Sequence, residues 1–349
     1  IFQAEDGIRD LDSSLVGSEM CIRDRIHDLT DLMLNCARTL DRRWTAAVAA
    51  GESINITEET NRFALDLIVI STFGDDAIRW IEEEGDNPFE FLSRDSARDL
   101  AVVMRVREVR QLLLELIQQR RSSEAEQHAD FMSMYLAATD KNGQPFTDEE
   151  LLDELITLVV AGFETSANTL NWAWYLLAKH SEVEARVIAE AQQFMPDAGA
   201  VNFENAKSMS YTQQVLEETL RLYPPVWLFT RRSNNTDEIL DYDVPVGTDV
   251  YLSPYILHRT DRFWPDPDKF DPDRLVVDDT AKKDRPYFPF SLGPRRCLGE
   301  YFSFLEMKIH LALLLPRYRM SLLDDSDPGL ELGINLRSAR DIMLLPKHR

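Results

Sequence analysis

Residues 290–299, with the sequence FSLGPRRCLG, form the most informative stretch of this chain. Cys297 lies between two glycines and beside two arginines, and the residues behind it, 300–314, have the apolar spacing of a helix. Glycines allow close backbone approach, and amides at the start of a helix stabilise a negatively charged sulfur. The stretch therefore suits a thiolate held against a flat metal complex, although a lone cysteine is more often a buried structural residue.

The spacing Phe-x-x-Gly-x-Arg-x-Cys-x-Gly fixes five residues in order, and all five are present: Phe290, Gly293, Arg295, Cys297 and Gly299. This pattern resembles the haem-binding loop of the cytochrome P450 family. The resemblance implies that the cofactor is haem b (iron protoporphyrin IX) and that Cys297 is its axial thiolate. It also implies that Arg295 binds a haem propionate and that Phe290 packs beside the sulfur. A thiolate ligand favours cleavage of the O–O bond, so chemistry with O₂ is expected.

A second informative segment, residues 161–166 (AGFETS), lies inside a predicted helix. A capping box at residues 147–150, TDEE, predicts the start of this helix, which should run to about Lys179. Gly162 costs about 1 kcal/mol relative to alanine in such a position. Ordinary small-residue packing, with the Thr165 hydroxyl bonded to the carbonyl four residues back, is one interpretation.

The same segment resembles the oxygen-binding segment of the cytochrome P450 family at every position. The resemblance implies that Ala161 and Gly162 let haem and O₂ approach the helix. It further implies that the hydroxyl of Thr165 donates to oxygen and that the carboxylate of Glu164 relays protons from water.

A third pattern, Glu218-x-x-Arg221, lies on a helix predicted over residues 211–223. By itself it indicates a helical ion pair worth about 0.5 kcal/mol at most on a surface. In the same family this pair is buried and binds an arginine from a later loop. Here that arginine is Arg274, although Asp273 and Leu275 depart from the usual Glu and Phe. The resemblance implies a structural triad rather than a catalytic one.

Three further polar residues have weaker signals. The predicted strand at 226–231 ends on Arg231, which by the resemblance binds another propionate and must be distinguished from its neighbour Arg232. His258 is interpreted as part of a structural loop, and His310 as a core residue on an apolar helix.

Composition limits the class of protein. A chain of 349 residues with 44% hydrophobic content can bury a sizeable core, and its net charge of −23 makes nucleic acid an unfavourable partner. Three widely spaced cysteines argue against a disulfide framework and favour a reducing compartment, so a cytoplasmic location is expected. Cys36 is interpreted as core. No run of about 18 apolar residues predicts a membrane span.

The first 25 residues resemble a translated sequencing-adapter artefact. We therefore interpret residues 1–25 as non-native and residues 26–349 as a partial cytochrome P450 haem domain. The resemblance implies that the native N-terminal helices are missing and that an N-terminal membrane anchor could be missing with them.

The predicted fold is mainly α with a small β portion, a cytochrome P450 fold without its N-terminal helices. Besides the helices named above, the spacing of apolar residues and capping signals predicts helices at 27–50, 61–73, 98–121 and 181–194, the last from a capping box at 181–184. Strands are predicted within 226–258 and 318–345.

By the resemblance, the function is monooxygenation of a small apolar organic substrate with O₂. A separate ferredoxin or flavoprotein reductase would donate electrons, docking near Arg295, Arg296 and Lys308. Two alternatives remain: a truncated, inactive fragment of such an enzyme, or a peroxide-driven haem-thiolate enzyme.

Overall fold

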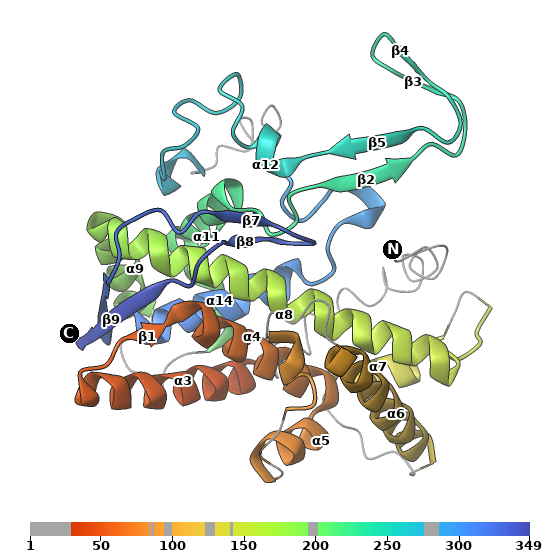
Figure 1. Ribbon diagram of the computed structural model, residues 1–349, viewed down its shortest axis with the longest axis horizontal. Coiled ribbons are helices and arrows are strands. Elements are labelled where there is room, and N and C mark those ends of the chain that lie inside the picture. Colours follow the sequence, from red (N-terminus) through yellow and green to blue (C-terminus); the bar gives the residue numbers. More distant parts are fainter. Residues whose placement is uncertain are drawn as a thin grey trace.

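The computed structural model describes residues 29–83, 85, 87–93, 100–122, 130–139, 142–194, 202–275 and 286–349. The predicted artefact at residues 1–25 lies outside this part of the chain. Within it the fold is mainly helical with small antiparallel sheets, which confirms the predicted fold class (Figure 1).

The long helix α8 (Asp148–Lys179) runs through the middle of the molecule, with α4 (Ile56–Phe73) packed along it (Figure 1). Every residue of α8 from Ser166 to Leu177 is buried, as expected for a helix in the centre of a core. Helix α14 (Glu300–Leu314), which follows Cys297, is also buried on nearly all sides and packs against α3 (Thr30–Ala50). These four helices form the core that supports both sequence motifs.

Local signals explain where these helices begin and end. The capping box of α8 is present: the Thr147 hydroxyl accepts from the amide of Glu150 (3.3 Å), and the Glu150 carboxylate accepts from the amide of Thr147 (2.8 Å). Gly51 ends α3 with a φ of +68°. Helix α4 begins at Ile56, five residues before the predicted start, because the Asn55 side chain caps it.

The predicted capping box at 181–184 is wrong. Ser181 is already the first residue of α9 (Ser181–Phe194), and the amide of Glu184 bonds to the carbonyl of His180 (3.0 Å). The Glu184 carboxylate instead pairs with Arg349. Glu184, which the local sequence pattern predicted to cap the helix, thus forms a tertiary ion pair with Arg349.

Shorter elements surround this core. The helical ones are α5 (Asp75–Ile78), a π-helix (Arg79–Glu83), a 3₁₀ turn (Glu90–Ser93), α6 (Leu100–Ser122), α7 (Phe131–Ala137), α10 (Phe203–Ser208), α11 (Ser210–Leu222), α12 (Pro254–Leu257) and 3₁₀ turns at Pro272–Leu275 and Gly293–Arg295. Helix α12 lies where only β structure was predicted, because Pro254 occupies a first-turn position that suits proline and Ser253 caps the turn.

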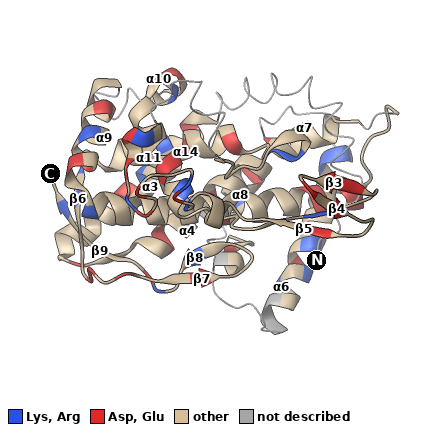
Figure 2. Ribbon diagram, turned by 90° about the horizontal axis from the view of Figure 1, so that it is seen from above, with Lys and Arg blue, Asp and Glu red and all other residues tan. Residues whose placement is uncertain are grey.

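The strands form four small antiparallel sheets. A three-stranded sheet has the order β1 (Ile54–Asn55), β9 (Met343–His348), β6 (Tyr318–Leu322). The other pairs are β2 (Phe229–Arg232) with β5 (Asp249–Leu252), β3 (Asp237–Ile239) with β4 (Tyr242–Val244), and β7 (Leu330–Leu332) with β8 (Leu336–Ser338). The β2–β5 ribbon and the β3–β4 hairpin extend away from the helical body, and acidic residues gather on that hairpin (Figures 1 and 2).

The remaining expectations for single residues are met. Cys36 packs against the hydrophobic core. His310 is fully buried, and its Nε2 accepts a hydrogen bond from the indole of Trp174 (2.9 Å). None of the helices in the described ranges is both long and apolar enough to cross a membrane.

Candidate functional site

The cysteine loop closes on itself before α14 begins. The amide of Cys297 donates to the carbonyl of Phe290 (2.8 Å), and the Phe290 ring packs against Phe304 of α14 (centroids 5.3 Å apart). Gly293 has a φ of +69°, which glycine adopts freely, whereas Ser291 has a φ of +63°, which is costly for a residue with a side chain. The loop therefore stores backbone strain at its start, in the residue that follows Phe290.

The sulfur of Cys297 faces the first turn of α14. Residue 297 is exposed as a whole, yet enough protein surrounds the sulfur that desolvation raises the pKa of its thiol. Hydrogen bonds from the amides of Gly299 and Glu300 act in the opposite direction, and a Cβ on Gly299 would lie only 3.8 Å from the sulfur. Burial outweighs these amides, and a cation bound at the sulfur would shift the balance toward the thiolate.

The middle of α8 presents one accessible side. Val160 and Ala161 are exposed, and Thr165 is half-buried. The Thr165 hydroxyl donates to the carbonyl of Ala161 (2.9 Å), as the packing interpretation predicted. Within the described residues, the Glu164 side chain makes no hydrogen bond or ion pair, so its carboxylate is available.

The packing of α8 against α4 explains why residue 162 is a glycine. A Cβ at this position would lie 2.8 Å from both Cδ1 and Cγ1 of Ile68 in α4. The missing side chain therefore lets α4 pack closely against α8, which accounts for a glycine in the middle of a long helix.

Ser166, the last residue of the segment, connects it to the cysteine helix. Its hydroxyl donates to the carboxyl of Glu306 in α14, and both residues are buried. Burial raises the pKa of Glu306 to about 8. The sequence analysis did not single out Glu306. The feature that could have identified it is a carboxylate within the otherwise apolar part of the helix that follows Cys297.

The structure brings Glu218, Arg221 and Arg274 together. The Arg221 guanidinium binds the Glu218 carboxylate through two hydrogen bonds (2.8 and 2.9 Å), and Arg274 Nε donates to the same carboxylate (3.0 Å). Glu218 and Arg221 are fully buried. Arg221 also donates to the carbonyl oxygens of His258 and Pro267 (both 2.7 Å), so the cluster pins the loop that follows α12.

His258 links this cluster to the cysteine loop, a role that sequence reasoning did not foresee. Its backbone carbonyl accepts from Arg221, and its Nε2 accepts from the amide of Phe288 (3.1 Å), two residues before Phe290. Burial, with Arg221 nearby, lowers the pKa of His258 to about 3, so the imidazole stays neutral and can accept this bond. The structural-loop interpretation of His258 agrees with these contacts.

The profile of the family described as "Cytochrome P450" matches residues 83–345. The chain belongs to the cytochrome P450 family. Among curated proteins, it is 37% identical over 212 residues to cyclooctatin synthase of Streptomyces melanosporofaciens, a match that covers 60% of this chain and 46% of that protein. It is 35% identical over 202 residues to pentalenene oxygenase of Streptomyces avermitilis, covering 58% of this chain and 45% of that one. The match thus spans less than half the length of these relatives.

Solved cytochrome P450 structures share the fold. The chain aligns over its full length with CYP102L1, covering 83% of that chain at a TM-score of 0.86 and 22% identity. It also aligns over 93% of its length with the retinoic acid-bound cyanobacterial CYP120A1, covering 76% of that chain at a TM-score of 0.81 and 25% identity.

Haem b is the cofactor of the cytochrome P450 family, and the donor set around Cys297 fits it. In the described ranges, no three His, Cys, Asp or Glu side chains lie close enough to hold a metal ion. One sulfur therefore suits a metal whose other ligands come from a porphyrin. Leu292 and Leu298 beside Cys297 are 64% and 50% exposed, as an apolar macrocycle would require.

Two arginines of this cytochrome P450 remain free to bind carboxylates. Across the described part of the chain, Arg295 has no hydrogen bond or ion pair, and the side chain of Arg231 reaches only the carbonyl of Thr230 (2.9 Å). Arg232 instead forms a bidentate pair with Asp249 (2.7 and 2.8 Å). Successive residues of a strand point to opposite faces, so only one of Arg231 and Arg232 can point toward a bound haem.

The expected docking role of Lys308 is wrong. Lys308 is only 6% exposed, its Nζ donates to the carbonyl of Lys207 (3.4 Å), and burial lowers its pKa to about 8. It therefore presents no charge at the surface. Arg296 is exposed but pairs with Glu300 four residues later.

Proposed function

We propose that this chain is the haem-bearing part, over residues 26–349, of a monooxygenase that inserts one atom of O₂ into a small apolar organic substrate. A ferredoxin or flavoprotein reductase supplies the electrons. The observation that carries the proposal is the sulfur of Cys297, which receives two backbone amide hydrogen bonds in the loop that is closed by the bond from the Cys297 amide to the Phe290 carbonyl. When bound, haem supplies the iron at which O₂ is reduced and split.

The residues of α8 supply protons and hydrogen bonds. The Thr165 hydroxyl, now bonded to the Ala161 carbonyl, can rotate to donate to the dioxygen substrate. Glu164, whose carboxylate has no partner in the described residues, exchanges protons with water. A peroxide-driven enzyme needs neither role, so the presence of both residues favours chemistry with O₂.

The names of relatives support an apolar substrate. Pentalenene oxygenase names an alkene, and cyclooctat-9-en-7-ol 5-monooxygenase names an alkenol. The exposed leucines beside Cys297 and the exposed Val160 of α8 are consistent with a site that binds such compounds.

The absorption spectrum of the dithionite-reduced protein with carbon monoxide tests the thiolate. We expect a strongly red-shifted Soret band that Cys297→Ala abolishes, because only sulfur ligation of the iron produces it. A red-shifted band that survives in Cys297→Ala would refute Cys297 as the ligand. Purified protein that binds no haem would favour the inactive-fragment alternative.

The roles on α8 are tested with a reductase, O₂ and a substrate that turns over. We expect Thr165→Ala and Glu164→Gln to divert most reducing equivalents from product to peroxide or to slow turnover at least tenfold. The matched control is Thr157→Ala, an exposed threonine of α8 whose hydroxyl also bonds to the carbonyl four residues back. Product formation with hydrogen peroxide, but not with reductase and O₂, would favour the peroxide-driven alternative.

A further inference from the structure

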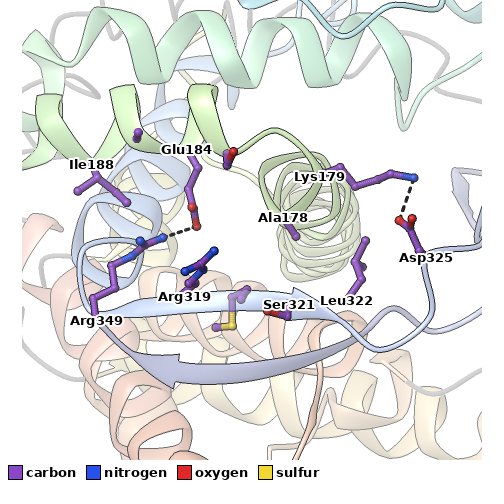
Figure 3. A pocket seen from close by; sticks show the side chains of 12 residues that line it. Ala178, Lys179, Glu184, Ile188, Arg319, Ser321, Leu322, Asp325 and Arg349 are labelled. Atoms are coloured by element: carbon purple, nitrogen blue, oxygen red, sulfur yellow. Dashed lines mark ion pairs between the residues drawn. The ribbon is translucent and has the colours of Figure 1, made fainter.

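A cavity of about 710 Å³ lies apart from the cysteine site and is lined by none of the residues described there. It lies between strand β6, the end of α8 and the start of α9 (Figure 3). Two ion pairs line it: Glu184 with Arg349 (2.5 Å) and Lys179 with Asp325 (3.3 Å). These pairs neutralise four of the charges around the cavity.

Arg319 of β6 also lines this cavity and carries the charge that these pairs leave uncompensated. Throughout the described ranges its guanidinium has no hydrogen bond or ion pair. Lys347 of β9 lies directly opposite Arg319 in the strand register, so the two cations share one face of the sheet. Lys347 does not itself line the cavity, so it adds positive charge near the site without contacting an occupant.

The backbone of β6 adds unpaired polar groups along the same cavity. The amide of Arg349 donates to the carbonyl of Arg317 (3.0 Å), and the amide of Leu323 donates to the carbonyl of Met343 (3.1 Å). Antiparallel pairing alternates, so the N–H and C=O groups of Met320 and Leu322 point away from β9.

On that outer edge, the guanidinium of Arg349 donates to the carbonyl of Tyr318 (3.2 Å). In the described part of the chain, the outward groups of Met320 and Leu322 make no backbone hydrogen bond to another segment. The outward groups of this edge strand are therefore available to a polar occupant of the cavity.

The other walls are apolar or carry hydroxyls. Ala178, Ala185 and Ile188 come from the two helices, and Ser181 and Ser321 add hydroxyl groups. The volume falls within the range of about 300–1,000 Å³ typical of small-molecule sites. An occupant that matches all these features has one anionic head and a short apolar tail.

We propose that this cavity binds a small aliphatic carboxylate, with its head on Arg319 and its tail along Ala178 and Ile188. A carboxylate accepts two parallel hydrogen bonds from a guanidinium, which suits the free Arg319. The site is separate from the proposed oxygen chemistry and does not depend on it.

Calorimetric titration of the haem-loaded protein with hexanoate tests the site. We expect Arg319→Gln to weaken binding at least tenfold and the matched control Arg317→Gln to leave it unchanged. Arg317 lies directly before the same strand, pairs with Asp41 and does not line the cavity. Circular dichroism checks that both variants fold.

Two further measurements separate this site from the haem pocket. Hexan-1-ol, which has the same tail and no charge, should bind at least tenfold more weakly than hexanoate. Hexanoate bound in the cavity should leave the Soret band in place. Equal affinity of Arg319→Gln and the unaltered protein, equal binding of the alcohol, or binding seen only with a Soret shift would each overturn the proposal.

Discussion

The hydroxyl of Ser166 donates a hydrogen bond to the carboxyl of Glu306, and the two residues are only 2% and 1% exposed. Ser166 ends the AGFETS segment of α8, and Glu306 lies nine residues after Cys297. Two segments that the sequence presents separately are therefore joined inside the core. Because burial raises the pKa of Glu306 to about 8, this carboxyl holds a proton at neutral pH.

The first prediction concerns Glu306→Gln and pH. The pKa of Glu306 is about 8 in the folded protein against an ordinary value of 4.5, so between these values the folded state binds more protons than the unfolded state. The contribution of Glu306 to the free energy of unfolding is therefore complete below pH 4.5 and falls as the pH rises through 8, by at most about 1.4 kcal/mol per pH unit.

Glutamine keeps the acceptor for Ser166 but does not titrate. The stability advantage of the unaltered protein over Glu306→Gln should thus shrink steadily from pH 5 to pH 8 in urea-unfolding experiments. Parallel pH profiles of the two proteins would show that Glu306 does not titrate in this range.

The second prediction concerns Gly162→Ala. Alanine normally stabilises a helix by about 1 kcal/mol relative to glycine, but here its Cβ would lie 2.8 Å from two side-chain atoms of Ile68. We expect a loss of about 1–3 kcal/mol from overpacking in thermal or urea unfolding. Ile68→Ala removes both of these atoms, so the double variant should be less destabilised than the sum of the single ones. Additive losses would mean that the two residues do not clash.

The third prediction concerns His258. In His258→Phe the ring is kept but the amide of Phe288 loses its acceptor, and an unpaired buried N–H costs about 1–3 kcal/mol. The variant should unfold more easily and retain less haem, because this bond holds the segment that leads into the cysteine loop. His258→Gln offers an acceptor oxygen and should recover part of both losses. Equal stability and equal haem retention in His258→Phe and His258→Gln would show that the hydrogen bond to the Phe288 amide does not determine these properties.

The fourth prediction compares two adjacent arginines. Arg231→Ala should speed the transfer of haem to an excess of apomyoglobin several-fold, since its guanidinium is free to bind a propionate. Arg232→Ala breaks a solvent-exposed pair with Asp249, which water screens, and should leave haem transfer unchanged. The reverse ranking would assign the haem side of β2 to Arg232.

Local patterns were enough to predict several parts of this protein. The capping box at Thr147 marked the start of α8, Gly51 and Gly74 marked the ends of α3 and α4, and the apolar spacing after Cys297 marked α14. Each of these signals acts within a few residues, through a cap, a glycine with positive φ or helical periodicity, so the sequence displays it directly.

Tertiary structure alone decided the rest. The partner of Ser166 lies 140 residues away, the acceptor for the Phe288 amide lies 30 residues back, and Glu184 leaves a predicted cap to pair with Arg349. The burial of Lys308 and the cavity beside Arg319 likewise result from tertiary packing and not from a local sequence pattern. Such contacts depend on how distant helices and strands pack, and a buried polar group finds its partner wherever packing places one, without a periodic trace in the sequence.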